Sequence, residues 1–460
     1  MSARFITIDR DTPLLMPPDM HDWLPDNHLV HFVVDAVSLM DLSMARVNRR
    51  GTGAMQYPPS MMLALLTYSY ATGVFSSRQI ERSTHDSVAV RFLCAGTHPD
   101  HDTICAFRRN NIALVESVFR QLLELAKASK LLRVGNISVA IDGTKVLASA
   151  SKHSAVSYEH AGRTIDALES EVAQLLRKAE DADSTPLQDG LTIPGEIERR
   201  QERIAKLQRA KAEIEARAFA RHAANQEDAA QKPAGCESQR DDDTPPDAGV
   251  GGSGPAPRPK DQVNFTDPHS RIMKTGDGFQ QAYNAQAGVD VRSRLIVGAR
   301  VSNAPNDKRE LLPDVAEICR HVKVHNVLID SGFVSEKAIS SVECGASGNG
   351  IGGRVLAAFG RERHGRSVEQ LEKRAAPPRP PADAPFMDHV RHRTRTACGR
   401  RLYKLRQQTV EPVFGIIKAA IGFRRFSLRG LQKVRSEWNL ICTAYNIRRL
   451  HTLGMPALMH

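Results

Sequence analysis

One acidic residue lies alone in a long basic segment near the end of this sequence. Between Arg391 and Arg435 the chain has 13 lysines and arginines, and Glu411 is the single acid. Two further acids, Asp142 and Asp330, each follow a short apolar run that is typical of a buried strand. Carboxylates bind Mg²⁺, and two such ions about 4 Å apart can act on a phosphodiester. The three acids are therefore candidates for a metal site beside basic side chains that would neutralise the phosphates of DNA.

Each of these acids also has a plainer interpretation. Glu411 could form an ion pair with Arg406 or Lys418, and the residues alone favour this over a metal ligand. Asp142 precedes a glycine, so it could be the aspartate of a simple turn. Pro412 directly follows Glu411, which means that a helix either begins or bends at this point.

The composition favours a polyanionic partner. The chain has 460 residues, with 63 lysines and arginines against 52 acids, a net charge of +11 and 41% hydrophobic residues. This length allows about two to four domains, and the positive charge favours nucleic acid or an anionic membrane surface. No apolar run reaches the roughly 18 residues that span a bilayer, and no signal peptide is evident. The seven scattered cysteines are typical of reduced thiols. We therefore expect a cytoplasmic, nucleoid-associated protein that binds nucleic acid and no membrane.

Four residues of zinc-ligand type lie within one twelve-residue stretch. They are Cys94, His98, His101 and Cys105. Their spacing matches none of the common zinc patterns. We expect two thiols that face the core and two loop histidines rather than a metal site.

Residues 1–135 are predicted to be mostly helical. Apolar residues recur at helical spacing in 28–42 and 58–73, and a longer helix is expected from about Thr103. Ser76 and Gln79 have the spacing of a capping box. Five arginines at the edges of these helices could form a helix-turn-helix-like DNA-binding unit or could simply be solvated: Arg78, Arg82, Arg91, Arg108 and Arg109.

The remainder of the chain is predicted to be one α/β region with an insertion. Strand patterns in 136–160 resume after residue 262 and continue, with helices, to residue 460. Between them, residues 161–261 change to charged, Ala-rich helical sequence that predicts an antiparallel hairpin. The end of this insertion, 233–260, is rich in Pro, Gly and Asp and is expected to be disordered.

Several motifs in the same order closely resemble bacterial insertion-sequence transposases of the DDE type. The C-terminal TVEPVFGIIKAAIGFRRFSLRG carries the resemblance most clearly, together with IDGTK at 141–145 and IDSGF at 329–333. NFTDPHSRIM at 264–273 and the helical segments before residue 110 are similar to the same family. The resemblance covers nearly the whole chain except the tail of the insertion.

The resemblance implies a ribonuclease-H-like mixed sheet with flanking helices, preceded by an all-α domain. It implies that Asp142, Asp330 and Glu411 are the catalytic acids and ligate two Mg²⁺ ions, with Mn²⁺ as a substitute. Asp330 is preferred to Asp290 as the second acid because it ends a strand that follows a helix, and Asp307 is expected to cap the next helix.

Basic and aromatic residues near Glu411 complete the implied site. Five residues are expected to contact DNA: Tyr403, Arg406, Lys418, Arg424 and Arg425. Six residues separate Glu411 from Lys418, as in the family signature, whereas four separate Arg406 from Glu411, one more than in the signature. Phe423 and Phe426 have the pattern of either base-stacking or core residues, and Trp438 is expected in the core.

The implied activity is DNA transposition. The protein would bind the terminal inverted repeats of its element through residues 1–135, cut each 3′ end and join it to target DNA. A homodimer on paired ends is implied as well. A nuclease of the same fold and a repressor that has lost catalysis remain alternatives, although the three acids and Lys418 argue against the repressor.

Overall fold

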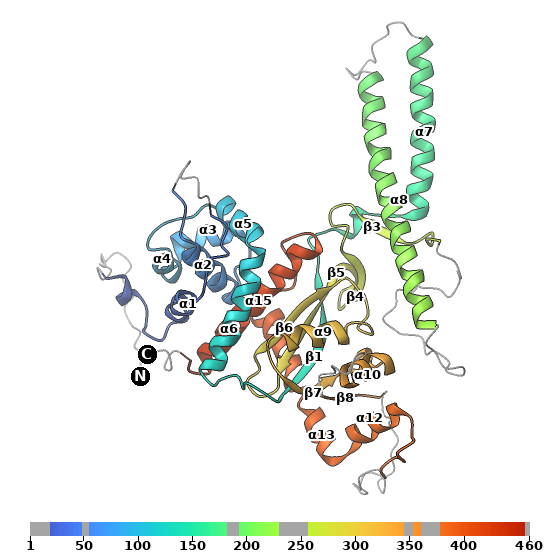
Figure 1. The fold of residues 1–460 in the computed structure, drawn as a ribbon. Helices are drawn as coiled ribbons and strands as arrows, with labels where there is room; N and C mark the ends of the chain where they lie inside the picture. Colours follow the sequence, from blue (N-terminus) through green and yellow to red (C-terminus); the bar gives the residue numbers. More distant parts are fainter. Residues whose placement is uncertain are drawn as a thin grey trace, which may run out of the picture.

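A mixed sheet lies at the centre of the molecule (Figure 1). The computed structural model describes residues 19–47, 55–181, 193–229, 256–344, 353–359 and 378–455. The strands of the sheet are β1 (Ile137–Leu147), β4 (Arg271–Thr275), β5 (Gly278–Asp290), β6 (Ile296–Ser302), β7 (Val324–Ile329) and β8 (Arg354–Ala357). On one side, β1 pairs in parallel with β7, and β7 pairs in parallel with β8. On the other side, β1 is antiparallel to β5, which also pairs antiparallel with β4 and β6. Because buried parallel strands need cover on both faces, helices must flank this sheet.

The N-terminal region is helical, as predicted. After a 3₁₀ turn, η1 (Met20–Trp23), its helices are α1 (Leu29–Ser38), α2 (Pro59–Ala71), α3 (Ser77–Asp86), α4 (Val88–Leu93), α5 (His101–Asn110) and α6 (Ile112–Ala128). The single long helix expected from Thr103 is divided at Asn111, whose side chain bonds to the carbonyl of Phe107 and to the amide of Arg46. The expected capping box is also wrong, because Ser76 occupies the N-cap of α3 without a side-chain capping bond.

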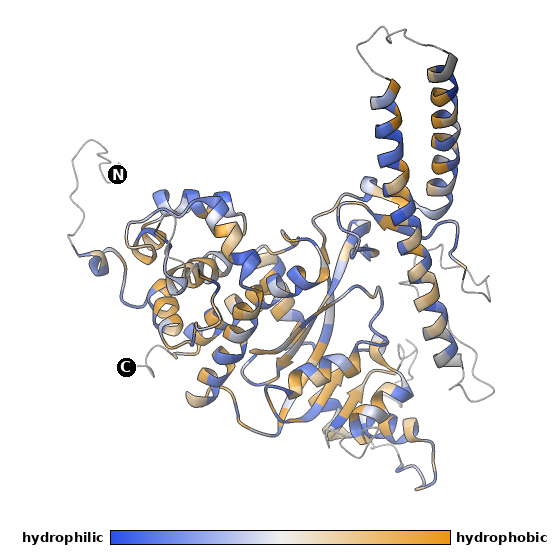
Figure 2. Cartoon of the chain, turned by 45° about the horizontal axis from the view of Figure 1, so that its top comes forward, coloured by the Kyte–Doolittle hydropathy of each residue, from blue (hydrophilic) through white to orange (hydrophobic). Residues whose placement is uncertain are grey.

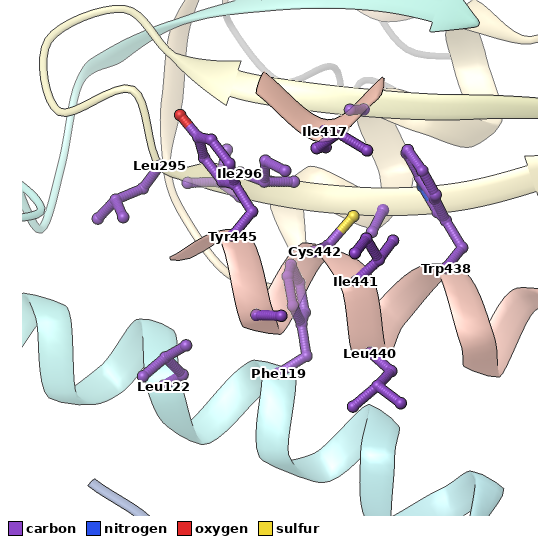
Figure 3. Close-up of a cluster of buried hydrophobic side chains, with 14 of the residues drawn as sticks. Phe119, Leu122, Leu295, Ile296, Ile417, Trp438, Leu440, Ile441, Cys442 and Tyr445 are labelled. Atoms are coloured by element: carbon purple, nitrogen blue, oxygen red, sulfur yellow. The ribbon is translucent and has the colours of Figure 1, made fainter. Parts of the chain in front are cut away.

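Helix α15 (Leu431–Thr452) joins the helical region to the sheet. It is buried on all sides, as expected for a helix in the middle of a core. Its side chains point towards the sheet on one side and towards α6 on the other, where Leu440 lies near Phe119 (Figure 3). Trp438 is fully buried, as predicted, and its indole N–H donates to the carbonyl of Gln286.

The phenylalanines of the basic segment belong to the core. Phe423 is 0% and Phe426 is 1% exposed. Phe423 lies edge-on to Phe75, and Phe426 lies edge-on to Tyr283. Neither ring is therefore accessible for stacking on a base, and the core interpretation of the sequence pattern applies.

The insertion forms a helical hairpin that projects from the body (Figure 1). Its helices are α7 (Tyr158–Asp181) and α8 (Ile193–Ala229), and the short strands β2 (Ala155–Ser157) and β3 (Gln262–Asn264) pair at its base. Hydrophobic and hydrophilic residues alternate along both helices (Figure 2). A small separate core joins the beginning of α7 and the middle of α8 to β2 and β3. The segment expected to be disordered falls almost entirely outside the described residues.

The remaining described helices pack against the antiparallel strands β5 and β6, lie along the parallel side of the sheet, or belong to the basic segment. They are α9 (Leu311–Cys319), α10 (Glu336–Cys344), α12 (Phe386–Arg395), α13 (Ala397–Lys404) and α14 (Val410–Gly415), with 3₁₀ turns at Lys152–Ser154 (η2) and Ser331–Phe333 (η3). A π-helical turn, Ile416–Ala420 (η4), follows α14. None of the helices among the described residues is long and apolar enough to cross a membrane. The N-terminal helices, the mixed sheet with its flanking helices and the inserted hairpin confirm the predicted fold class.

Candidate active site

Asp142 lies inside a strand rather than at its end. The sequence predicted that the strand would finish at this acid, but β1 continues to Leu147 because β5 pairs with it along its whole length. On its other side, β1 pairs with β7 only as far as Ala140. Asp142 therefore lies just beyond the last paired residue of β7.

Asp330 and Glu411 come from the two neighbouring elements. Asp330 directly follows β7, at the same edge of the sheet as Asp142. Glu411 is in the first turn of α14, where the helix begins, and Pro412 suits this position because a helix's first N–H groups have no partner. Of the two alternatives stated for Pro412, a helix therefore begins there and does not bend.

The three acids meet at one guanidinium. Nη2 of Arg406 is 2.9 Å from Oδ2 of Asp142 and 3.8 Å from Oδ2 of Asp330, and Nη1 is 3.9 Å from Oε1 of Glu411. The Arg406 side chain is only 7% exposed, and its Nε has no hydrogen-bond partner among the described residues. The expected alternative, an ion pair between Glu411 and Arg406, is present but long, and it is shared with both aspartates.

The environment of Asp142 disfavours its charged form. The pKa of Asp142 is raised to about 6, mainly by burial and also by the charges of Asp330 and Asp307. Arg406 and the backbone N–H of Gly143 act in the opposite direction and lower this pKa. A cation placed near Asp142 would therefore stabilise its carboxylate.

Tyr403 lies beside the acids, whereas Lys418 does not contact them. The hydroxyl of Tyr403 donates to the carbonyl of Ile329, the residue before Asp330, and burial raises the pKa of Tyr403. Nζ of Lys418 donates to the carbonyl of Lys145 on β1, 2.9 Å away. Burial lowers the pKa of Lys418, and the charges of Arg424 and Lys145 lower it further.

Arg424 and Arg425 are exposed and are held at the end of β1. The N–H of Leu147 donates to the carbonyl of Arg424, and the N–H of Phe426 donates to the carbonyl of Leu147. Nε of Arg424 also donates to the carbonyl of Lys418. The basic pair is thereby fixed to the strand that carries Asp142, with both guanidinium groups open to solvent.

Family models match both ends of the chain. Residues 383–451 match a model described as a transposase DDE domain, and residues 18–110 match a transposase domain (DUF772). The chain belongs to the transposases with a DDE domain. No curated protein and no solved structure matched it. A DDE domain implies an enzyme that cleaves phosphodiester bonds, and a transposase binds DNA. The DDE family in general uses divalent metal ions.

The match to the DDE domain covers part of the candidate site of this transposase. Glu411, Arg406 and Tyr403 lie within the matched residues, whereas Asp142 and Asp330 precede them. The three carboxylates are oxygen ligands of the kind that Mg²⁺ prefers. They surround a guanidinium, however, and the described residues contain no group of three His, Cys, Asp or Glu side chains arranged to hold a metal ion.

A fourth acid of the transposase lies close to this site and was missed by the sequence interpretation. Asp307 does not cap α9, whose N-cap is Glu310. Its Oδ1 instead accepts from the amides of Asn284 and Gln286, at 2.6 Å each, and lies 3.9 Å from Nζ of Lys145. The available signal was the recurrence of buried amide side chains, Asn284 and Gln286, at alternate positions of β5.

The other candidate residues have structural partners. Asp290 accepts from the N–H and hydroxyl of Ser293, and it therefore forms the turn between β5 and β6. Arg108 is buried and bonds to Tyr70 and to the carbonyl of Phe75, so it cannot contact DNA. The other four arginines of that region, Arg78, Arg82, Arg91 and Arg109, are exposed.

The stretch with zinc-ligand residues forms no metal group. Cys94 is buried, in agreement with a core-facing thiol, whereas Cys105 is only partly buried. His98 bonds to Thr84 and stacks on His85, and His101 forms an ion pair with Glu81. His98 lies in a loop, as expected, whereas His101 is the first residue of α5.

Proposed function

We propose that this transposase binds the terminal inverted repeats of its element, cleaves the DNA ends by metal-dependent hydrolysis and transfers the 3′ ends to target DNA. One observation carries the proposal. Carboxylates from residues 142, 330 and 411 lie within 4 Å of a single guanidinium, at the edge of a basic segment. One guanidinium offsets only one of three negative charges, and neighbouring carboxylates raise the free energy of one another's charged forms, so a divalent cation would stabilise the group further.

Asp142, Asp330 and Glu411 are the residues that would hold the metal. Two Mg²⁺ ions, with Mn²⁺ as a substitute, would supply activation of an attacking oxygen and neutralisation of charge at the phosphorus. The protein's own contribution is to hold the phosphodiester still and to complement the charge that develops on it. In the proposal, Arg424, Arg425 and Lys418 bind phosphates, and Tyr403 orients the end of β7 that carries Asp330.

The remaining regions are assigned by the same proposal. Residues 1–135 would bind the element ends, with the exposed arginines of α3 facing the DNA. Residues 136–160 and 262–460 would form the catalytic domain, with 161–261 as its insertion. Pairing of two ends would require a homodimer.

Cleavage of a labelled DNA that carries the element's end tests the role of Glu411. Glutamine in place of Glu411 keeps the shape of the side chain and removes its charge. The wild type should cut in Mg²⁺, and Glu411→Gln should bind the DNA but cut at least about a hundredfold more slowly. The matched control is Glu336→Gln, an exposed acid on α10, which should cut like the wild type. Normal cutting by Glu411→Gln would reduce Glu411 to an ion-pair partner of Arg406.

A second assay separates a transposase reaction from simple hydrolysis. A DNA end that has already been cut is incubated with the protein and a target plasmid. Joined products support strand transfer, whereas an enzyme that cleaves intact ends but never joins pre-cut ends would be a nuclease of the same fold.

A further inference from the structure

Arg406 stands in the position where a bound cation would be expected. It is the one positively charged side chain, among the described residues, that has ion pairs of 4 Å or less with Asp142, Asp330 and Glu411. The two nearest lysines are engaged elsewhere: Lys145 faces Asp307, and Lys418 bonds to the backbone of β1. The guanidinium therefore supplies the positive charge that these three carboxylates require.

The contacts of Arg406 are looser than those of a permanent buried ion pair. A guanidinium has five N–H donors, yet Arg406 makes one hydrogen bond in this site, at 2.9 Å to Asp142. Its distances to Asp330 and Glu411 are 3.8 and 3.9 Å, and those two side chains are 49% and 55% exposed. Unused donors of a buried arginine can instead bind a phosphate, for which the planar guanidinium is well suited.

We propose that Arg406 closes the metal site in the absence of DNA and opens it when a phosphodiester draws its guanidinium away. This inference rests on the proposed function, because it takes the three acids to be the metal ligands. A guanidinium and a divalent cation cannot share the space between the same carboxylates, since they repel each other and compete for the same oxygens. The protein without DNA should accordingly bind the metal weakly, and DNA should raise its affinity for the metal. The device would restrict cleavage to DNA that is correctly placed.

Metal binding by the full-length protein tests this directly, without any measurement of activity. Free Mn²⁺ is followed by its electron paramagnetic resonance signal during titration of the protein in the absence of DNA. Arg406→Gln should bind Mn²⁺ at least about tenfold more tightly than the wild type, and adding Asp142→Asn to it should remove that gain. Arg292→Gln, which alters an exposed arginine at the far end of the sheet, should bind like the wild type. Equal Mn²⁺ affinity in Arg406→Gln and the wild type would overturn the inference.

A second measurement uses the wild type alone, and it tests the closure of the metal site by Arg406 even if Arg406→Gln does not fold. A duplex carrying the element's end should raise the protein's Mn²⁺ affinity by a similar factor, measured against the duplex without protein. A Mn²⁺ affinity that DNA leaves unchanged would overturn the inference.

The proposed function can fail separately: if Glu411→Gln cuts DNA normally, the catalytic assignment is wrong whatever the Mn²⁺ titrations show. If cutting depends on Glu411 while Arg406→Gln binds Mn²⁺ like the wild type, only the present inference fails.

Discussion

At the scale of single residues, the absence of a side chain at Gly143 makes room for the polar groups beside Asp142. A Cβ at this position would lie 2.4 Å from Nε2 of Gln286, 2.7 Å from Oδ1 of Asp307 and 2.8 Å from Oδ1 of Asn284. Real Cβ atoms do not approach other atoms so closely. Asn284 and Gln286 are almost fully buried and have little space into which to move. Gly143 is therefore required by a close approach and not by an unusual backbone angle.

Replacement of Gly143 by alanine should destabilise the protein. We expect Gly143→Ala to lower the free energy of unfolding by about 1–3 kcal/mol, because overpacking forces buried side chains out of their preferred positions. The control is Gly162→Ala on α7, where a Cβ would meet nothing within 4 Å. That change should stabilise its helix by about 0.5–1 kcal/mol. Denaturant unfolding of both variants measures the difference, and a neutral Gly143→Ala would show that the polar cluster can rearrange.

The sequence could name the acids but not their mutual contacts. Asp330 and Asp142 each follow a short apolar run, and Glu411 is the single acid in a basic segment, so local patterns single them out. The contact of Arg406 with Asp142 joins residues 264 positions apart, and no local pattern encodes it. Likewise, Asp307 has the sequence context of a helix cap. It faces Asn284 and Gln286 only because β6, which leads to Asp307, pairs with β5 in the folded sheet.

At the scale of elements, α13 presents a cationic face next to the candidate site. Tyr403 anchors this helix to the last residue of β7, and the helix contains no acid. Arg400 and Lys404 are one helical turn apart and therefore share a face. Both are exposed, and neither forms an ion pair with any described residue. A phosphate backbone that leads to Asp330 would meet this face first.

The salt dependence of DNA binding should reveal phosphate contacts of α13. Each phosphate contact contributes about 0.9 to the slope of log K against log salt concentration. Changing Arg400 and Lys404 together to alanine should reduce the slope by up to about 1.8 in magnitude and weaken binding to all sequences alike. The matched control changes Arg292 and Lys323, which are exposed near the opposite end of the strands. Equal slopes for the two double variants would mean that α13 does not contact the phosphates of DNA.

Element lengths were less predictable than element types. The apolar run before Asp142 gave a strand, but its continuation to Leu147 depends on hydrogen bonds to β5 that only the folded sheet provides. The division between α5 and α6 at Asn111 likewise depends on a bond from the distant Arg46. In both places tertiary contacts override the local preference of the chain.

At the scale of the whole molecule, the N-terminal helices and the sheet share one hydrophobic core. This core runs from α1 and α2 through α6 and α15 into β1, β5 and β7. A buried polar network crosses it as well: the hydroxyl of Tyr70 donates to Glu437 on α15, and Arg108 donates to that hydroxyl. The carboxylate of Glu437 also accepts the N–H groups of Ser427 and Leu428, close to the basic pair. The helical region and the sheet should accordingly unfold together.

The inserted hairpin should behave differently, because its small core is separate from the main one. The two ends of the hairpin meet: the N–H of Tyr158 donates to the carbonyl of Asp261 at 2.9 Å, and that of Glu159 donates to the carbonyl of Pro259 at 3.1 Å. Residues 160–258 can therefore be replaced by a linker of about four glycines and serines. The temperature of the main thermal transition of this deletion variant should stay within about 2 °C of the wild type, since the partly exposed contacts it loses contribute little.

Tyr70→Phe should instead lower the temperature of the main transition measurably, because it leaves the buried charges of Arg108 and Glu437 with one hydrogen-bond partner fewer. Calorimetry compares the two variants, and a deletion variant that loses as much stability as Tyr70→Phe would mean that the hairpin folds as part of the body.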